Sequence, residues 1–468
     1  MPTNFYDGID AFGSAPAAIT EANEWISYAQ VAAMADAVAS VLRPRSLVLL
    51  VCSNTLESLV GYLGCLRARA VPLVVGSSGN DRHAEDLLRA YRPEFLWAPR
   101  TTMAAGRGTA VHVLSDYVLT RTSPSGTDRM HDSLALLLTT SGSTGSPALV
   151  RLSYANLDSN TRAIVEYLGI SSADRPITTL PMSYTYGLSI INSHLLCGCA
   201  IVLTSRSVID KGFWAALRAH EATTFGGVPY TYEMLSKLRF PGMDVPSLRT
   251  VTQAGGKLPA DRARELAVAC REKGIRFIVM YGQAEATARM SWLPAEHAVS
   301  KAGSIGMAIP GGKLWLEDES GRVITASGVE GELVYQGENV SLGYAHSRED
   351  LAKGDENRGV LRTGDLAERD ADGFYYITGR RKRFLKLFGN RVSLDDVERM
   401  LAAAGFESAC SGVDDHLRVY TTSRERHPDL IRMVAEYTGI HPSAFAVAYV
   451  ERIPRNESGK VIYPALAG

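Results

Sequence analysis

The sequence has no long hydrophobic run and almost no net charge, and each shortage excludes a class of protein. No segment approaches the roughly 20 apolar residues that a membrane-spanning helix needs. The N-terminus, MPTNFYDGIDAFGSAPAAIT, has no basic segment followed by an apolar one, so we expect no secretory signal. The 49 Lys and Arg residues balance 50 Asp and Glu residues, and no overall field favours nucleic acid or an anionic membrane. We therefore expect a cytoplasmic protein that binds neither.

Cysteine is also scarce, with six residues in a chain of 468. They are scattered through apolar segments. The one close pair, Cys197 and Cys199, is separated by one residue instead of the two that are usual in zinc and redox pairs. We expect reduced thiols in the core.

The length and composition are those of a folded protein of several domains. Hydrophobic residues make up 46% and charged residues 21% of the chain, which is ordinary for globular proteins. Domains of about 100 to 200 residues predict two to four of them here. The sequence contains no repeat and no low-complexity segment.

Strand-like and helix-like segments alternate in the first two thirds of the chain. Apolar segments of strand length occupy residues 46–52, 70–76 and 199–205, and helical patterns occupy residues 29–42 and 56–70. Such alternation predicts βα units and an α/β fold with largely parallel sheets that helices cover on both faces.

The pattern changes after Val323 to short strands separated by Gly, Asp and Asn, which is typical of antiparallel strands or a small barrel. From about Arg381 the chain is long enough for a small α+β domain. We expect helices there at 393–404 and 429–439 and strands at 416–422 and 444–454.

Residues 139–145, TTSGSTG, follow the apolar segment LALLL and could hold phosphate. Gly142 and Gly145 would let backbone amides turn toward a ligand, and five hydroxyl groups could donate to phosphate oxygens. The segment is not a Walker A loop, because it lacks Gly-Lys-Ser/Thr. An ordinary polar turn is the alternative.

Three further segments carry residues suited to a nucleotide. In MYGQAEATARMSW, residues 280–292, Tyr281 could stack on a purine and Glu285 could bind Mg²⁺. In LRTGDLAERDADGFYYITGR, residues 361–380, we expect Asp365 in a Gly-Asp turn, where its carboxylate would suit ribose hydroxyls. In IPRNESGKVIYPAL, Lys460 follows a Ser-Gly pair. The alternatives are a solvated glutamate, two hairpin turns and an exposed lysine.

In order and spacing, these four segments resemble the adenylate-forming superfamily of acyl-coenzyme A synthetases, carrier-protein adenylation enzymes and luciferases. The resemblance covers nearly the whole chain, since ISYAQVAAMADAVASVL, LPMSYTYGLS, GELVYQGENVSLGY and GRRKRFLKLFGNRVSLDDVE also match in register. It implies an AMP-forming acid ligase that joins a carboxylate to the α-phosphate of ATP, releases pyrophosphate and passes the acyl group to a thiol.

The resemblance also implies two domains and a set of site residues. Residues 1–380 would form the large domain, with doubly covered sheets and a small barrel, and residues 381–468 a small mobile α+β domain that turns about a hinge near Lys382. Lys460 and Glu285 would be catalytic, with Glu285 binding Mg²⁺. The residues that would bind ATP are Thr140, Ser141, Gly142, Ser143, Thr144, Gly145, Gly255, Gly256, Tyr281, Gly282, Asp365 and Arg380.

Within that set the resemblance implies separate tasks. Residues 140–145 would hold the β- and γ-phosphates, Gly255, Gly256 and Tyr281 would flank adenine, and Asp365 and Arg380 would lie at the ribose. Lys460 would bridge the carboxylate and the α-phosphate, because two anions must approach each other there. The basic run GRRKRFLK has a nucleic-acid patch as its alternative, but its apolar residues favour a hinge and a strand.

The chain departs from the superfamily pattern at two phosphate contacts. Ala148 stands where relatives usually have a lysine, and Ala284 where they have a threonine. We expect weaker phosphate contacts but not the loss of the site, since one hydrogen bond contributes about 0.5 to 3 kcal/mol depending on charge. Arg151, three residues after Ala148, is the candidate to replace the lysine. A nucleotide-binding protein without turnover is the alternative.

The segment LPMSYTYGLS matches the start of the acid pocket in the superfamily. Tyr184, Tyr186, Gly187 and Val228 are the predicted pocket residues. Members that activate α-amino acids usually carry an aspartate beside the first aromatic residue, where this chain has Thr185. A buried ammonium without a counter-ion is costly, so we expect a small acyl or aryl acid without an amino group.

The sequence leaves the acceptor open. The main expectation is a thiol, that of coenzyme A or of the phosphopantetheine on a separate carrier protein. Attack by a nitrogen nucleophile, or activation of an unusual oxyacid, is the alternative chemistry.

Overall fold

The computed structural model describes residues 4–77, 81–102, 108–122, 129–139, 148–381, 383–388, 390–455 and 461–466. By compactness the chain divides into two units. One contains Met1–Lys313 and Tyr335–Leu361, and the other contains Leu314–Val334 and Arg362–Gly468. The domain boundary expected after residue 380 stays a prediction.

The largest sheet of the first unit has eight strands in the order β19-β9-β8-β4-β3-β5-β7-β6. Its centre is parallel and consists of β3 (Leu47–Cys52), β4 (Val71–Gly76), β5 (Phe95–Pro99) and β8 (Leu134–Thr139). All six residues of β3 are buried, which is why its sequence is a continuous apolar run. The strands expected at 46–52 and 70–76 are therefore confirmed.

Both edges of this sheet are antiparallel. They are formed by β6 (Thr109–Leu114) and β7 (Tyr117–Arg121) on one side, and by β9 (Leu149–Ser153) and β19 (Gly343–Ala345) on the other. The expectation of largely parallel sheets thus holds for the centre only, because β7 pairs antiparallel with β5 and β9 pairs antiparallel with β8.

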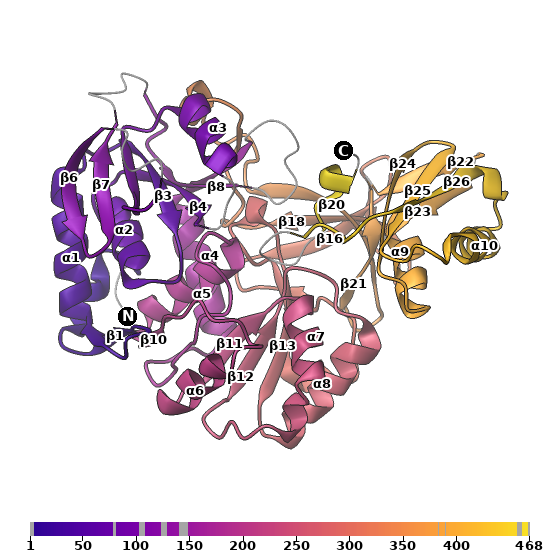
Figure 1. Cartoon of the computed structure of the whole chain (residues 1–468), viewed down its shortest axis with the longest axis horizontal. Coiled ribbons are helices and arrows are strands. Elements are labelled where there is room, and N and C mark those ends of the chain that lie inside the picture. The colour runs from indigo at the N-terminus through magenta and orange to yellow at the C-terminus, as the bar shows by residue number, and fades with distance from the viewer. Residues whose placement is uncertain are drawn as a thin grey trace. The chain divides into compact units, whose positions relative to one another are not determined.

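Helices α1 (Tyr28–Val41) and α2 (Leu56–Arg67) confirm the helical patterns at 29–42 and 56–70 and lie side by side in Figure 1. The side chain of Ser27 accepts a hydrogen bond from the Gln30 amide, and the Gln30 side chain accepts one from the Ser27 amide, so α1 begins with a capping box. A Cβ on Gly64 would lie 2.8 Å from the Cβ of Val38, which shows how closely the two helices pack.

A second sheet of the first unit carries three predicted site residues at or just after its strand ends, namely Val228, Gly255 and Tyr281. Strands β11 (Thr224–Gly227), β12 (Thr250–Gln253) and β13 (Arg276–Tyr281) are parallel. Two antiparallel strands complete it, β14 (Ser291–Leu293) and β15 (Met307–Ala308). Side chains converge at the carboxyl ends of parallel strands, which is where ligands bind in α/β sheets. Helix α6 (Lys211–Ala219) precedes β11 in the sequence, α7 (Pro229–Lys237) follows β11, and α8 (Ala260–Glu272) follows β12.

The strand expected at 199–205 is shorter than predicted. Only β10 (Ile201–Val202) forms, in a three-stranded sheet with β1 (Pro16–Ile19) and β2 (Trp25–Ser27). The pairing ends because the amide of Thr204 donates to the side chain of Thr178 instead of to a neighbouring strand.

The second unit contains a five-stranded sheet and a smaller α+β region. The sheet runs β17 (Val323–Ile324), β16 (Lys313–Glu317), β18 (Gly331–Gln336), β20 (Val360–Arg369) and β21 (Tyr375–Arg380). The pairs β16–β17 and β20–β21 are antiparallel, as expected after Val323.

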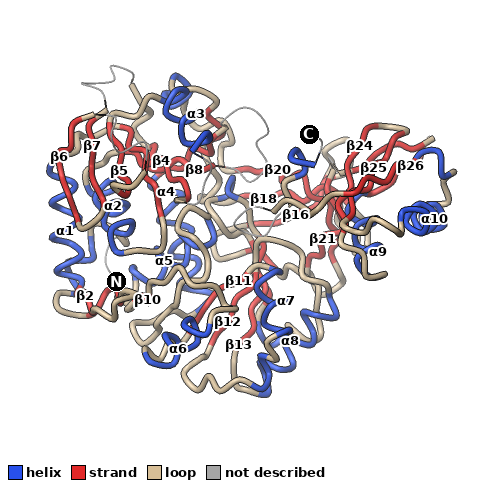
Figure 2. Tube along the Cα trace, in the orientation of Figure 1, coloured by secondary structure: helices blue, strands red, loops and turns tan. Residues whose placement is uncertain are grey.

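The predicted elements of the C-terminal region are also present (Figure 2). Helices α9 (Leu394–Ala403) and α10 (His427–Thr438) match the expected helices, and β25 (His416–Thr421) and β26 (Phe445–Tyr449) match the expected strands. The remaining strands are β22 (Phe384–Leu387), β23 (Asn390–Ser393) and β24 (Ser408–Val413).

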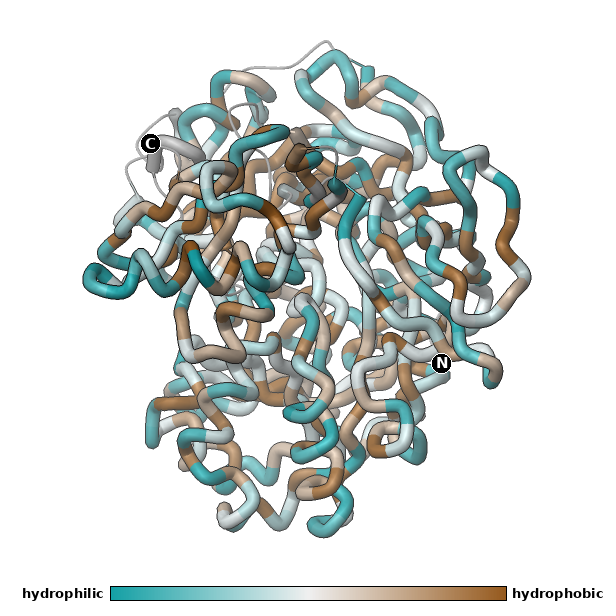
Figure 3. The backbone as a smooth tube through the Cα atoms, turned by 90° about the vertical axis from the view of Figure 1, so that its right-hand side faces the viewer, coloured by the Kyte–Doolittle hydropathy of each residue, from teal (hydrophilic) through white to brown (hydrophobic). Residues whose placement is uncertain are grey.

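All six cysteines are free and buried, as expected of core thiols. Burial raises the pKa of the Cys197 thiol to about 11, so it stays protonated. Hydrophobic and hydrophilic stretches are interspersed along the trace in Figure 3. In the described part of the chain, no helix is both long and apolar enough to span a membrane.

Candidate functional site

The predicted phosphate loop connects two neighbouring strands of the eight-stranded sheet. Residues 140–147 themselves lie outside the described residues, as do Lys382 and Lys460, so the roles of all these residues stay predictions. On either side of the loop, Thr139 at the end of β8 pairs with Leu149 at the start of β9. A loop that joins two paired strands of a buried sheet has its ends fixed by the sheet.

Arg151 does not replace the missing lysine, which corrects the expectation from sequence. Its side chain is fully buried, and its guanidinium donates to the backbone oxygens of Leu342, Tyr344, Lys353 and Gly354. It also donates to the carboxylate of Glu356 at 2.5 Å. Sequence alone gave no direction for this side chain, because all of its partners lie about 200 positions further along the chain. Arg151 instead holds residues 342–356 against β9.

The YGQAEA segment folds back sharply after β13. A Cβ on Gly282 would lie 1.7 Å from the backbone oxygen of Ala288, so only glycine allows this close approach. Tyr281 at the end of β13 is half-buried, and its hydroxyl accepts a hydrogen bond from Gln283 at 3.2 Å. The predicted adenine-stacking ring is thus fixed at a strand end.

Glu285 is positioned by a residue that sequence analysis missed. The hydroxyl of Tyr344 in β19 donates to Oε1 of Glu285 at 2.5 Å. Burial raises the pKa of the Tyr344 phenol and the charge of Glu285 raises it further, so the hydroxyl keeps its proton and acts as the donor. The neighbouring Ala284 packs its methyl group against the main hydrophobic core. Where relatives have a hydroxyl, this chain has an apolar contact.

Three predicted residues from separate segments meet at one point. Gly255, which follows β12, has a φ of +82°. A Cβ at this position would lie 2.4 Å from the Tyr184 hydroxyl oxygen and 3.0 Å from Cγ1 of Val228. Burial raises the pKa of Tyr184 to about 12. The predicted adenine segment and the predicted acid pocket therefore share a wall.

The other predicted pocket residues are more structural. The hydroxyl of Tyr186 lies 2.8 Å from the Thr252 backbone oxygen, to which it donates, so it is occupied within the protein. Gly187 lies in the first turn of α5 (Thr185–Leu196), and a Cβ there would lie 2.4 Å from the Pro181 oxygen. A Cβ on Gly256, which was predicted beside adenine, would lie 3.1 Å from Pro229. Close packing explains both glycines without a ligand.

Arg289 is a second residue that sequence analysis missed. Its guanidinium carbon lies 4.9 Å from the centre of the Tyr186 ring, and its side chain is buried. The ring of Tyr186 in turn lies 6.3 Å from that of Tyr184, edge to face. The available signal was a single arginine within an otherwise uncharged segment, ATARMSW. A buried cation therefore lies next to one of the predicted pocket residues.

Asp365 and Arg380 pair with each other in the second unit. They are opposite one another in β20 and β21, and Nε of Arg380 donates to Oδ1 of Asp365 at 2.9 Å. The expected Gly-Asp turn is wrong, since Gly364 and Asp365 lie within β20. Cross-strand pairing with β21 keeps the chain extended here, and the φ of +71° at Gly364 is accommodated inside the strand.

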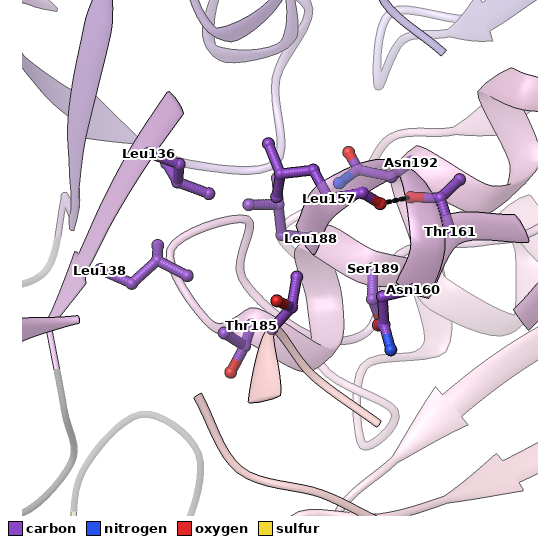
Figure 4. A pocket seen from close by; sticks show the side chains of 10 residues that line it. Leu136, Leu138, Leu157, Asn160, Thr161, Thr185, Leu188, Ser189 and Asn192 are labelled. Atoms are coloured by element: carbon purple, nitrogen blue, oxygen red, sulfur yellow. Dashed lines mark hydrogen bonds between the residues drawn. The ribbon is translucent and has the colours of Figure 1, made fainter. Parts of the chain in front are cut away.

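A small cavity lies between β8, α4 (Tyr154–Leu168) and α5, and Figure 4 shows the side chains that line it. Its volume is about 10 Å³, which is the space for one water molecule and not for an acid or a nucleotide. The side-chain oxygens of Asn160 and Asn192 lie buried at its wall and have no donor among the described residues. A buried water at this place would satisfy both.

Comparison with known proteins identifies the family. The model of the AMP-binding enzyme family matches residues 6–345, more than half of the chain. The chain belongs to the AMP-binding enzyme family. The expected membership of the adenylate-forming superfamily is thereby confirmed, and so is the expected enzyme class of AMP-forming acid ligases.

The curated relatives of the chain include CoA ligases of one aryl acid. The chain is 29% identical to the 2-succinylbenzoate–CoA ligase of Bacillus velezensis over 342 residues, which are 71% of this chain and 68% of the relative. It is 25% identical to the enzyme of the same name from Bacillus pumilus over 376 residues, which are 78% of this chain and 73% of the relative. These names agree with the main expected activity, in which an acid becomes a thioester.

Solved structures share the fold over the full length. The O-succinylbenzoate coenzyme A synthetase of Bacillus subtilis, in complex with ATP and magnesium, matches with a TM-score of 0.80 at 22% identity and covers 99% of each chain. ATP-bound MatB from Rhodopseudomonas palustris matches with a TM-score of 0.77 at 24% identity, covering 100% of this chain and 98% of that one. The expected α/β fold class is confirmed.

Proposed function

We propose that the chain activates a small carboxylic acid, acyl or aryl, with ATP and then forms a thioester. The carboxylate oxygen attacks the α-phosphorus, pyrophosphate leaves, and the acyl adenylate forms. A thiolate then attacks the acyl carbon and AMP leaves. The family match over residues 6–345 carries this proposal, and the shared wall of Tyr184, Val228 and Gly255 supports it.

Coenzyme A is the acceptor that we propose first, because the curated relatives are named as CoA ligases. A phosphopantetheine thiol on a separate carrier protein has the same reacting group and is the second source. Both thiols attack in the same way, so the acceptor must be distinguished by offering each in turn.

Glu285 fits the role of a Mg²⁺ ligand. Mg²⁺ prefers oxygen ligands and is held in such enzymes by one or two carboxylates together with phosphate oxygens. Tyr344 donates to Oε1 of Glu285 and so orients the carboxylate. The ion would neutralise phosphate charge as pyrophosphate leaves. For the nucleotide, we propose that Asp365 and Arg380 bind the ribose, that Tyr281, Gly255 and Gly256 flank adenine, and that residues 140–145 hold the phosphates. We propose that Lys460 contacts the reacting groups and that Lys382 is the hinge.

The proposed acid carries no amino group. Thr185 stands where an aspartate would meet the ammonium of an amino acid. Arg289 adds a second argument, because its positive charge beside the predicted pocket residue Tyr186 would repel an ammonium. A buried ammonium beside a buried guanidinium would have no compensation.

A test of this function measures pyrophosphate release with ATP, Mg²⁺ and a panel of acids, and then thioester formation with coenzyme A or a phosphopantetheinylated carrier. We expect release with at least one non-amino acid. Glu285→Gln should lower the rate, while the exposed Glu296→Gln is the matched control. Release with α-amino acids alone would contradict the proposed acid class.

A second candidate function follows from the altered phosphate contacts. Ala148 and Ala284 replace two expected phosphate ligands, and Arg151 is committed to Glu356. A protein that binds ATP without turnover would fit these losses. It would show ATP binding in the same experiment but no pyrophosphate with any acid. An amine or hydroxylamine trap in place of the thiol detects the alternative nitrogen acceptor.

A further inference from the structure

Three arginines of the chain are among its largest fully buried side chains, and they differ in their partners. Arg151 pairs with Glu356 at 2.5 Å. Arg348 pairs with Glu94 through two hydrogen bonds. Arg289 is paired with no carboxylate among the described residues. Burying a charge is costly unless it is paired, so Arg289 is the exception that needs a reason.

The protein groups around Arg289 are neutral. Its Nη1 donates to the Tyr167 hydroxyl at 3.1 Å and lies 3.1 Å from the sulfur of Met280. Burial raises the pKa of Tyr167, so the phenol keeps its proton and is no counter-ion. The Nε of Arg289 is buried and has no hydrogen-bond partner in the part of the chain that the structure describes. The described residues thus leave a donor and a charge of the guanidinium unsatisfied.

The backbone that carries Arg289 is held rigidly. The backbone oxygen of Arg289 accepts from the side-chain amides of Asn160 at 2.8 Å and Asn339 at 3.1 Å. Thr287 has a φ of +68°, an uncommon value for a β-branched residue, and its hydroxyl donates to the Asn339 oxygen at 2.6 Å. Such strain persists where the surroundings fix it and is concentrated at functional sites.

The guanidinium lies against a predicted residue of the acid pocket. It stacks on Tyr186, whose ring is next to Tyr184, and Tyr184 meets Val228 and Gly255 at the proposed reaction centre. An acid that enters beside Tyr184 with its reacting carboxylate toward ATP would extend along Tyr186 to Arg289.

We infer that Arg289 binds a second anionic group of the acid substrate, so that the enzyme selects a dicarboxylate or a comparably dianionic acid. This inference rests on the proposed function. The bound anion would supply the charge and the acceptor that the buried guanidinium lacks, in a charge-assisted hydrogen bond. The partner at Arg289 is thus part of the ligand, whereas Arg151 and Arg348 have theirs in the chain.

The test compares matched acids that differ in one carboxylate, namely butanoate with butanedioate and benzoate with the three benzenedicarboxylates. We expect at least one dicarboxylate to be preferred over its partner by about tenfold to a hundredfold in kcat/KM for pyrophosphate release, the usual range for a charged hydrogen bond. Arg289→Met should bring that ratio close to one, and Arg289→Lys should restore part of it. The exposed Arg271→Met, at the end of α8, is the control and should keep the ratio.

A thermal measurement separates binding from a structural role. Arg289→Met should keep or raise the Tm of the ligand-free protein, because it removes an uncompensated charge, whereas Arg348→Met should lower it. The preferred dicarboxylate should raise the Tm of the wild type and not that of Arg289→Met. A Tm that falls in Arg289→Met as far as in Arg348→Met would overturn the inference.

Two kinetic outcomes would also overturn it. If Arg289→Met keeps the preference for the dicarboxylate over the matched monocarboxylate, the guanidinium does not bind the second anionic group. An equal loss with both acids of a pair means that it binds the reacting carboxylate instead. If no acid gives pyrophosphate, the proposed function fails. In that case, a rise in Tm with a dicarboxylate still tests whether an anion binds at Arg289. No rise with any dicarboxylate counts against it.

Discussion

The two sides of the proposed reaction centre differ in charge. On the phosphate side, Ala148 and Ala284 stand where the superfamily usually has a lysine and a threonine. On the acid side, Arg289 is a buried cation with no carboxylate partner among the described residues. The phosphate side thus lacks the positive charge of the usual lysine, and the acid side has a positive charge that the superfamily pattern does not predict. Divergence in this chain therefore concerns the acid as much as the nucleotide.

The largest loss of stability that we predict comes from removing an arginine that is buried in an ion pair. Removing the unpaired Arg289 should have a smaller effect. Arg348→Met should lower the free energy of unfolding by about 3 to 5 kcal/mol, because it leaves Glu94 buried and unpaired. Chemical denaturation measures the loss, with Arg271→Met as the exposed control. If Arg348→Met were no less stable than Arg289→Met, the contrast between paired and unpaired arginines would have no energetic meaning.

A pH effect on stability tests the acid side further. His194 is fully buried in α5, and burial lowers its pKa from 6.5 to about 4, a shift to which the charge of Arg289 adds. The unfolded chain therefore binds this proton more readily than the native one, and stability present above about pH 6.5 is lost as the pH falls toward 4. The loss should reach about 3 kcal/mol. His194→Gln should remove this part of the pH dependence, while the exposed His416→Gln should leave it.

Lys460→Ala measures how much the reaction depends on Lys460, the cation that we propose for the carboxylate and the α-phosphate. We predict a fall in pyrophosphate release of at least about a hundredfold with ATP affinity nearly unchanged, since removal of one electrostatic donor typically has that effect. Lys211→Ala, at the exposed start of α6, is the control. Wild-type release from Lys460→Ala would end the role assigned to it.

Ala148→Lys should restore the missing charge and tighten ATP binding by about 1 to 3 kcal/mol. Because Arg151 is engaged with Glu356 and four backbone oxygens, it should not repel the new ammonium. Calorimetry of Ala148→Lys, with the exposed Ala33→Lys as a charge control, gives the answer. Equal ATP affinity in both variants would mean that residues 140–147 are no phosphate site.

The smallest effect should come from Tyr344→Phe. Loss of the hydrogen bond to Glu285 should reduce activity by about 0.5 to 1.5 kcal/mol, and raised Mg²⁺ should recover part of it if Tyr344 acts by orienting a metal ligand. Tyr437→Phe, at an exposed tyrosine of α10, is the control. A loss that Mg²⁺ does not change would place Tyr344 outside metal binding.

Local elements were predictable from sequence and distant partnerships were not. The apolar run of β3 and the periodicity of α1 need only their own residues, and both were predicted within one position. Gly364 and Asp365 look like a turn by composition, but pairing with β21 makes them part of a strand. The ion pair of Arg151 joins residues 205 positions apart, and no local pattern reports that.

The candidate site follows the same rule. The resemblance identified Tyr184, Val228 and Gly255 as separate site residues. Only the structure shows that these three residues lie next to one another. Arg289 and Tyr344 lie within quoted segments, residues 280–292 and 331–344, but neither was singled out, because their importance depends on which side chains surround them. Burial and the absence of a counter-ion are properties of three-dimensional neighbours, so sequence alone could not single out Arg289.

The way in which Arg289 is held has an evolutionary consequence. Its backbone is fixed by Asn160, by Asn339 and by the fold-back at Gly282, and these contacts involve main-chain atoms of residues 288 and 289. Replacing the side chain at position 289 therefore leaves the support of that position intact. A single codon change there could give a lineage, or an engineer, an enzyme with a different acid on an unchanged scaffold.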